Sequence, residues 1–159
     1  MYLESGGYTI TPTDSDTISV TCHASSERRL DNVKVEIEPG ISTAELQVRN
    51  TPDGGNFQAI IEVPRRSNLW IRLTAGELVV DDIEGDKNLE LRAGRLRVDI
   101  PHPEQYGHRD ASVLTGAIDA SAFGVSKGGL FRSFEQSGSG EYRLHAHVTS
   151  GQIDLTGGH

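Results

Sequence analysis

A unit centred on a glycine occurs twice within residues 69–100, and this repeat constrains the fold more than any other feature of the sequence. Each copy has apolar residues five and three positions before its glycine, a small residue directly before it, and apolar residues two and four positions after it. The first copy comprises Ile71, Leu73, Ala75, Gly76, Leu78 and Val80, and the second, eighteen residues later, comprises Leu89, Leu91, Ala93, Gly94, Leu96 and Val98. The chain is therefore built from successive copies of one structural element.

The spacing of the apolar residues within a copy predicts a β-strand with a bend. Apolar and polar residues alternate on each side of the glycine, which is typical of a strand. The alternation shifts by one position at the glycine, because Leu78 follows Ala75 by three residues and must return to the same interior. A flat strand has a side-chain period of two and cannot do this, whereas a bend or bulge at a glycine can.

Two further copies are centred on Gly116 and Gly151, at intervals of twenty-two and thirty-five residues. They comprise Ala111, Val113, Thr115, Gly116, Ile118 and Ala120, and Ala146, Val148, Ser150, Gly151, Ile153 and Leu155. Repeats of about twenty residues are typical of solenoids, in which each repeat buries its apolar face only by stacking on its neighbours. The sequence therefore predicts an all-β fold, a β-solenoid or single-stranded β-helix-like stack of glycine-cornered repeats. The alternative is a β-sandwich whose strands share a bend.

Stacking of the copies in chain order makes two specific predictions. Residues at matched positions should form four interior columns, namely Ile71–Leu89–Ala111–Ala146, Leu73–Leu91–Val113–Val148, Leu78–Leu96–Ile118–Ile153 and Val80–Val98–Ala120–Leu155. Outward residues of adjacent parallel strands, about 4.8 Å apart, should also face one another in register. The expected opposite-charge pairs are Arg72 with Glu90, Glu77 with Arg95, and Arg97 with Asp119.

The length of 159 residues predicts one domain, residues 1–159, with an N-terminal β portion at 1–64 and the repeat portion at 65–158. The N-terminal portion has antiparallel signals in place of the repeat. Its predicted elements are strands at Tyr8–Ile10, Thr17–Thr21, Val33–Ile37, Ala44–Val48 and Phe57–Val63, a helical turn at Glu27–Leu30 capped by Ser25 or Ser26, and a turn at Thr51–Asn56 that joins the last two strands in a hairpin. Two insertions interrupt the repeat, a predicted loop at Pro101–Asp110 and a predicted hairpin at about 124–144.

The net charge, the lengths of apolar runs and the cysteine count limit the classes of partner and location that we expect. The net charge of −8 disfavours nucleic acid and anionic membrane surfaces, because neither attracts an acidic protein. No run of eighteen apolar residues is present, so we expect no membrane span, and the opening MYLESGG does not resemble a signal peptide. The single Cys22 cannot form an internal disulfide and does not indicate a compartment.

Several of these marks together resemble a known family. The Val63-Pro64 pair before the repeat, the recurring Gly-x-Leu/Ile corner, the Gly85-Asp86 turn and the ending GSGEYRLHAHVTSGQIDL are similar to the bacterial β-strand-repeat family that carries an adhesin name and has no assigned function. The resemblance runs from about Val33 to Leu155. It implies a β-solenoid-like fold and an extracytoplasmic location, periplasmic or at the cell surface, and it brings no catalytic motif. The long PHPEQYGHRD segment departs from the family pattern.

Two patterns invite a catalytic interpretation. Residues 124–128 match the G-x-S-x-G pattern with Ser126 as the nucleophile, but that motif works on a strand-to-helix elbow of an α/β fold, and no helix is predicted after it. Cys22 and His23 are neighbours on a predicted strand, so their side chains point to opposite faces and cannot form a catalytic pair. We interpret Ser126 and Lys127 as turn residues and Cys22 as a small core residue.

Three groups could in principle hold a metal. His145 and His147 share one strand face, in the outward phase. His102, Glu104, His108 and Asp110 lie within one predicted loop. Asp81, Asp82, Glu84 and Asp86 form an acidic turn, but an EF-hand loop counted from Asp82 would need a Glu where Ala93 stands. We interpret all three groups as solvated side chains and expect neither a bound metal nor a cofactor.

Trp70 lies in the outward phase near Arg65, Arg66 and Arg72. It could anchor a ligand or pack under the N-terminal portion, and we favour packing.

Three functional hypotheses follow. The first is a non-catalytic structural or binding module, adhesin-like, whose partner is a cell-surface protein or glycan. The second is a carbohydrate-active β-helix enzyme, which would need paired carboxylates in an exposed cleft, with the acidic turn around Asp82 as the candidate. The third is a structural protein that self-assembles by end-to-end stacking.

Overall fold

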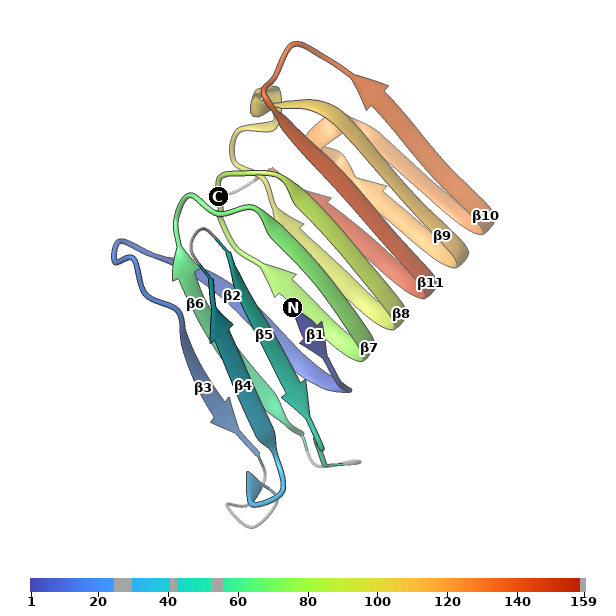
Figure 1. Cartoon of the computed structure of the whole chain (residues 1–159). Coiled ribbons are helices and arrows are strands. Elements are labelled where there is room, and N and C mark those ends of the chain that lie inside the picture. The colour runs from blue at the N-terminus through green and yellow to red at the C-terminus, as the bar shows by residue number, and fades with distance from the viewer. Residues whose placement is uncertain (25–29, 41–42, 53–55, 158–159) are drawn as a thin grey trace.

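The structure is a computed structural model that describes residues 1–24, 30–40, 43–52 and 56–157, with the backbone alone described for 126–131. Strands account for 70% of the residues and helices for 5%, so the prediction of an all-β chain is confirmed. The strands form one mixed, open sheet that folds over on itself into two facing layers (Figure 1).

The strands in chain order are β1 (Tyr2–Leu3), β2 (Gly6–Thr13), β3 (Ser19–His23), β4 (Lys34–Pro39), β5 (Ala44–Arg49), β6 (Gln58–Pro64), β7 (Leu69–Val80), β8 (Lys87–Asp99), β9 (Tyr106–Ala120), β10 (Val125–Ser137) and β11 (Tyr142–Thr156). Two 3-10 turns, η2 (Pro103–Gln105) and η3 (Ser121–Phe123), flank β9. Among the described residues, no helix is long and apolar enough to cross a membrane.

Each repeat forms one long strand that bends at its glycine. The bend lets β7, β8, β11 and β9 contribute one arm to each layer, as the folded-over ribbons in Figure 1 show. The glycines are in register across the parallel pairs, in the order Gly76, Gly94, Gly151 and Gly116. We call these positions glycine corners.

Backbone contact between corners explains why the residue is glycine. Gly94 has φ +126°, a conformation that side chains disfavour, and a Cβ placed there would lie 1.8 Å from the carbonyl oxygen of Gly76. A Cβ placed at Gly151 would meet the carbonyl oxygen of Gly94 in the same way, and a Cβ placed at Gly116 would meet that of Gly151. Each corner therefore packs its backbone directly onto the next one.

Strand order is the same in both layers apart from the N-terminal elements. The arms before the corner follow the order β4-β5-β1-β7-β8-β11-β9-β10, and the arms after it follow β3-β6-β2-β7-β8-β11-β9-β10. Pairs inside the stack are parallel, whereas the outermost pairs, β4 with β5, β3 with β6 and β10 with β9, are antiparallel.

The predicted interior positions are confirmed. All sixteen residues of the four columns are at most 2% exposed, and they form one core with the inward residues of β2, β5 and β6. Burial of these aliphatic side chains from both arms is the main stabilising term for such a fold.

The predicted order of the copies is wrong in one respect. The fourth copy, β11, lies between β8 and β9, so the second and third copies are not neighbours. Arg72 faces Glu90 and Glu77 faces Arg95 as predicted, but Arg97 faces Asp154 instead of Asp119. The connection through η2 carries the chain past one strand position, and β11 fills the position left open.

The N-terminal portion differs from the prediction as well. β5 and β6 do not form a hairpin, because β5 lies in one layer and β6 in the other. β5 pairs with β4 and β1, and β6 pairs with β2 and β3. The antiparallel signals therefore describe only the two outermost pairs of this portion. The predicted helical turn at 25–30 and the centre of the turn at 51–56 lie outside the described residues, Leu30 excepted.

This portion also contains a fifth corner that the sequence analysis missed. Gly6, with φ +157°, lies in register with Gly76, and Leu3, Tyr8 and Ile10 occupy the repeat positions and are buried. β1 and β2 are thus the two arms of one bent repeat.

Both insertions are more regular than expected. β9 already begins at Tyr106, so only the first half of Pro101–Asp110 is a loop. Residues 124–144 do not form a hairpin of their own, because β10 pairs along its length with β9 through the left-handed turn at Gly124.

Candidate ligand-binding groove

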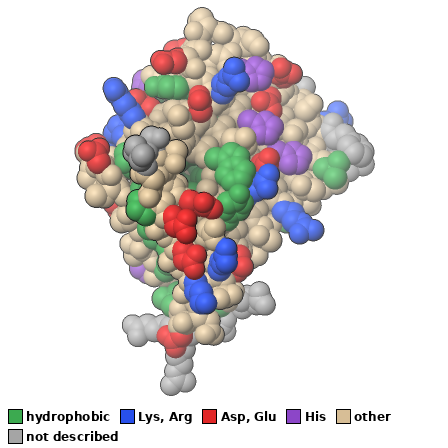
Figure 2. All heavy atoms as spheres, in the orientation of Figure 1, with side chains coloured by type: hydrophobic (Ala, Val, Ile, Leu, Met, Phe, Trp, Pro, Cys, Tyr) green, Lys and Arg blue, Asp and Glu red, His purple; other side chains and the backbone are tan. Residues whose placement is uncertain are grey.

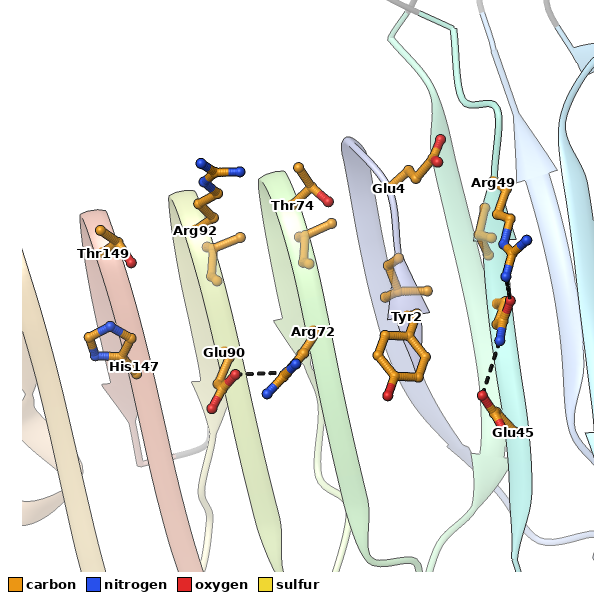
Figure 3. A pocket seen from close by; sticks show the side chains of 15 residues that line it. Tyr2, Glu4, Glu45, Arg49, Arg72, Thr74, Glu90, Arg92, His147 and Thr149 are labelled. Atoms are coloured by element: carbon orange, nitrogen blue, oxygen red, sulfur yellow. Dashed lines mark hydrogen bonds and ion pairs between the residues drawn. The ribbon is translucent and has the colours of Figure 1, made fainter.

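An open groove of about 870 Å³ lies on the outer face of the arms before the corner, across β5, β1, β7, β8 and β11 (Figure 3). Parallel register arranges its side chains in two rows. The row next to the corner contains Arg49, Glu4, Thr74, Arg92 and Thr149, and the following row contains Gln47, Tyr2, Arg72, Glu90 and His147. Side chains from both portions of the chain therefore meet in one surface.

Most charges in the groove are already engaged by neighbours. The Arg72 Nε donates to Glu90 Oε2 at 2.9 Å. The Glu4 carboxylate accepts from the backbone N–H of Asn50 at 2.6 Å. Gln47 accepts from Arg49 and donates to Glu45 at 3.0 Å. These contacts hold the side chains in place, and among the described groove residues the Arg72–Glu90 contact is the one that joins opposite charges.

Arg92 is the exception. It is exposed, and no hydrogen bond or ion pair connects its guanidinium to any other described residue. Thr74 and Thr149 lie on either side of it in the same row (Figure 3). In the next row, His147 Nδ1 shares a hydrogen bond of 2.8 Å with Ser112 Oγ, which leaves Nε2 for another partner. The groove thus offers a free cation beside hydroxyl and imidazole groups.

Two exposed aromatic rings border the groove. Tyr2 is 42% exposed and Trp70 is 39% exposed, and they meet edge to face with centroids 5.2 Å apart. The Arg72 guanidinium carbon lies 4.9 Å from the centroid of the Trp70 ring. Figure 2 shows hydrophobic side chains near the centre of this face, among acidic, basic and histidine side chains. Trp70 therefore packs on the N-terminal portion through Tyr2, as expected, yet keeps much of its ring accessible.

The Met1 amino group also contributes to this border. It donates to the carbonyl oxygen of Trp70 at 2.6 Å. Burial lowers the pKa of this amine, and the carboxylate of Glu45 opposes part of that effect. The first residues of the chain are thereby attached to β7.

The acidic turn is held by ion pairs and hydrogen bonds. Asp82 lies 3.8 Å from Arg65, Glu84 lies 3.3 Å from Arg66, and Asp86 accepts from the backbone N–H of Arg143 at 2.8 Å. Burial raises the pKa of Asp81, with Asp99 adding to the effect and Arg97 opposing it. The turn therefore braces the connection between β7 and β8.

The histidines fall into two groups. His102 pairs with Glu104 at 3.4 Å in the loop before β9. His108 and Asp110, predicted in the same loop, lie on β9, where Asp110 contacts His108 at 3.6 Å and His145 at 2.5 Å. Among the described residues, no group of three or more His, Cys, Asp or Glu side chains has an arrangement that could hold a metal ion.

The catalytic patterns lack their structural context. Ser126 lies within the strand β10, opposite Asp119, and not on a strand-to-helix turn. Ser112 contacts His147 whereas the carboxylate of Asp110 contacts His145, so these four groups do not form a serine–histidine–aspartate relay. Cys22 is partly buried on β3, and burial raises the pKa of its thiol.

Among the residues whose side chains the structure describes, one lysine lies in the interior. Lys87 is 1% exposed and stands between Leu69 and Leu144 in register. Its ammonium donates to the carbonyl oxygens of Ile83 and Gly85 and to the hydroxyl of Tyr106. Burial lowers the pKa of Lys87 to about 8, against the opposing effect of Asp82, Asp86 and Glu84. The turn between β7 and β8 is thus tied to β9 from inside the core.

Sequence reasoning singled out Trp70, with Arg72 near it, but favoured packing over ligand binding, and it did not single out Tyr2, Arg92 or the β5 residues. The signal for Tyr2 was available, since the spacing around Gly6 is that of the repeat. The contribution of Gln47 and Arg49 had no such signal, because it depends on β1 lying between β5 and β7.

No protein-family model matches the chain, and no curated protein matches it. One solved structure is similar: a crystal structure of a "putative cell adhesion protein" from Clostridium sporogenes ATCC 15579, with a TM-score of 0.59 and 13% sequence identity. The similarity covers 98% of this chain and 89% of that one. At this identity the likeness shows a common fold. It gives weak support to an adhesin-like fold resemblance, and no family model places the chain in the β-strand-repeat family.

Proposed function

We propose that this protein is a non-catalytic, adhesin-like binding module, and that the groove across β5, β1, β7, β8 and β11 is its binding surface. The observation that carries the proposal is the free Arg92 together with the exposed Tyr2 and Trp70 rings on one rigid sheet face. Large exposed aromatic rings beside an unpaired charge are uncommon on a surface that binds nothing.

We also infer that the fold is a β-solenoid-like stack. In-register parallel pairing of equivalent positions, such as Arg72 with Glu90, and the backbone contact between glycine corners support this description over a sandwich of independent strands. A stack of this kind presents a flat outer face whose side chains are fixed by register, which suits binding.

The likeness to a named cell adhesion protein supports a role outside the cytoplasm. The test is binding of the labelled protein to bacterial and animal cells and to a glycan array. We expect the Arg72→Ala/Arg92→Ala variant to lose binding and Arg97→Ala to retain it, since Arg97 is exposed on the same strand but outside the groove. Equal binding by all three proteins would show that the groove is not the binding surface.

Self-association is a second candidate. Val35 and Ile37 of β4 pair in register with the buried Val48 and Leu46, so they share the inward face, yet they are 38% and 40% exposed. The core is therefore partly open at this end of the stack. Sedimentation velocity from micromolar to millimolar concentration should show association that Ile37→Lys abolishes; a monomer at all concentrations would exclude this function.

A further inference from the structure

We propose that the groove binds an acidic oligosaccharide, with sugar rings packed on Trp70 and Tyr2 and a sugar carboxylate paired with Arg92. This inference rests on the proposed function of the groove and identifies the chemical class of its ligand. The ligand is a chain of pyranose rings that carry carboxylates, as in uronic acids and sialic acids.

One cation of the groove is available to an anionic ligand. Glu90 is paired with Arg72, Glu4 accepts backbone hydrogen bonds and Glu45 accepts from Gln47. Among the described arginines of the groove, Arg49 and Arg92 have no ion-pair partner, and Arg92 in addition makes no side-chain hydrogen bond. A planar guanidinium matches the two oxygens of a carboxylate, and such bidentate bonds are stronger than neutral hydrogen bonds.

The aromatic rings favour a sugar over a small anion. A pyranose has one face of C–H groups, which packs on an aromatic ring, and a rim of hydroxyls that needs hydrogen-bond partners. The partly exposed rings of Trp70 and Tyr2 supply the first requirement, with the Arg72 guanidinium lying over one side of Trp70. Thr74, Thr149 and the free Nε2 of His147 supply the second, since each can donate or accept a hydrogen bond.

The spacing favours an oligosaccharide over a single sugar. Trp70 on β7 pairs with Asn88 on the adjacent strand β8, and Arg92 lies four residues after Asn88 along β8. With about 3.3 Å per residue and about 4.8 Å between strands, their Cα atoms are about 14 Å apart. A ligand of several rings can contact both side chains at this separation.

The negative net charge of the chain disfavours some classes of anionic ligand. At a net charge of −8, a long uniform polyanion such as nucleic acid is repelled over most of the surface. A carboxylated sugar differs from a phosphate polymer because each ring keeps an apolar C–H face beside its charge, so one ring can pair with Arg92 while neighbouring rings pack on the aromatic side chains.

The experiment is isothermal titration calorimetry with hexagalacturonate, 3′-sialyllactose, cellohexaose and a glycerol phosphate polymer as probes. The variants are Arg92→Ala, Arg92→Lys and Trp70→Ala, and Arg97→Ala serves as the matched control on β8. We expect hexagalacturonate to bind the unaltered protein and to bind Arg92→Ala at least about tenfold more weakly, because a charge-assisted pair is lost. Arg92→Lys should recover part of that loss, Trp70→Ala should also weaken binding about tenfold, and Arg97→Ala should leave it within about twofold.

The probes separate the possible failures. Stronger binding of 3′-sialyllactose than of hexagalacturonate, with the same dependence on Arg92, supports the inference and identifies a terminal sialic acid as the source of the carboxylate. Equal binding of cellohexaose and hexagalacturonate would overturn the acidic ligand while retaining a groove that binds glycans. Binding of the phosphate polymer alone would overturn the sugar. If no probe binds while Arg72→Ala/Arg92→Ala still abolishes cell binding, this inference fails and the proposed function stands. If that variant binds cells normally, both fail.

Discussion

The two portions of this chain move between the layers of the fold in different ways. In the repeat portion, a single strand crosses from one layer to the other at a glycine corner, four times over. In the N-terminal portion, Gly6 does so once, and β5 and β6 are joined by residues 50–57. Both routes deliver alternating apolar residues to the same core, as the burial of Leu46, Val48, Ala59 and Ile61 shows.

The difference shows what the glycines are for. The carbonyl oxygen of Phe57 would lie 3.2 Å from a Cβ placed at Gly6, whereas the carbonyl oxygen of Gly76 would lie 1.8 Å from a Cβ placed at Gly94. What requires glycine is the close approach of successive corners, where the backbone of one copy lies against the backbone of the next. Contact between neighbouring copies therefore explains why each copy of the repeat keeps a glycine at its corner.

The largest expected effect comes from filling a corner. Gly94→Ala should lower the free energy of unfolding by more than about 3 kcal/mol, because the new Cβ would meet the Gly76 carbonyl oxygen and φ would stay positive. Gly124→Ala is the control, since φ there is +74° but no atom lies within 4 Å of the added Cβ, and it should cost only about 1–2 kcal/mol. Urea unfolding followed by circular dichroism measures both. Equal losses would mean that backbone strain, and not contact between copies, selects glycine.

The second prediction compares a residue in the middle of the stack with a residue at its N-terminal end. Leu96→Ala should cost about 2–5 kcal/mol, because Leu96 is fully buried and its removal leaves a cavity. Ile37→Ala should cost less than about 1.5 kcal/mol, because Ile37 is already 40% exposed. Thermal and urea unfolding of both variants give the comparison. A loss at Ile37 as large as that at Leu96 would show that a second molecule covers the end of the stack.

The repeat made the interior predictable but not the order of the copies. Matched apolar positions identify which residues are inward, because register within a strand has a period of two, and every predicted column residue is buried. Which copies are neighbours depends on the connections. The intervals of twenty-two and thirty-five residues, against eighteen, were the signal that the third and fourth copies depart from simple succession.

The N-terminal portion and the groove were harder to predict for the same reason. The alternation around Leu46 and Ala59 identifies strands but not their partners, and the hairpin prediction assumed that consecutive strands pair. The groove combines side chains of β1 and β5 with those of β7, β8 and β11, so it exists only once that pairing is known. Arg92 looked like any exposed arginine in the sequence, and only the engaged state of its neighbours makes it distinctive.

The third effect tests Lys87, a charged residue buried in the core of the repeat portion. The pKa of Lys87 is about 8 in the folded protein and about 10.4 in an unfolded chain. Between these values the unfolded state binds more protons, so stability rises with pH. From pH 7.5 to 9.5 the free energy of unfolding should rise by about 2 kcal/mol more in the unaltered protein than in Lys87→Met.

Comparison with Lys87→Met removes the effects of other groups. Burial raises the pKa values of Cys22, Tyr8 and Tyr106, so their unfolded forms lose protons first and stability falls as pH rises past their ordinary pKa values. Both proteins share these groups. Parallel stability curves for the two proteins, from urea unfolding at each pH, would contradict a buried lysine with a lowered pKa.

The smallest effect compares outward charges in the two portions. In the repeat portion, register sets Arg72 beside Glu90, whereas in the antiparallel pair β4–β5 it sets Glu38 beside Glu45. Exposed pairs are worth at most about 1 kcal/mol, and like charges directly opposite are destabilising by similar amounts. A double-mutant cycle to alanine should therefore give a favourable coupling for Arg72–Glu90 and an unfavourable one for Glu38–Glu45, and both should shrink in 1 M salt. Couplings of the same sign would mean that the charges of the outermost pair do not face each other in solution.

The sign of the Glu38–Glu45 coupling is informative because a repelling pair at the edge weakens the attachment of β4, where Val35 and Ile37 already expose the core. This end is thus the place where the stack should open first.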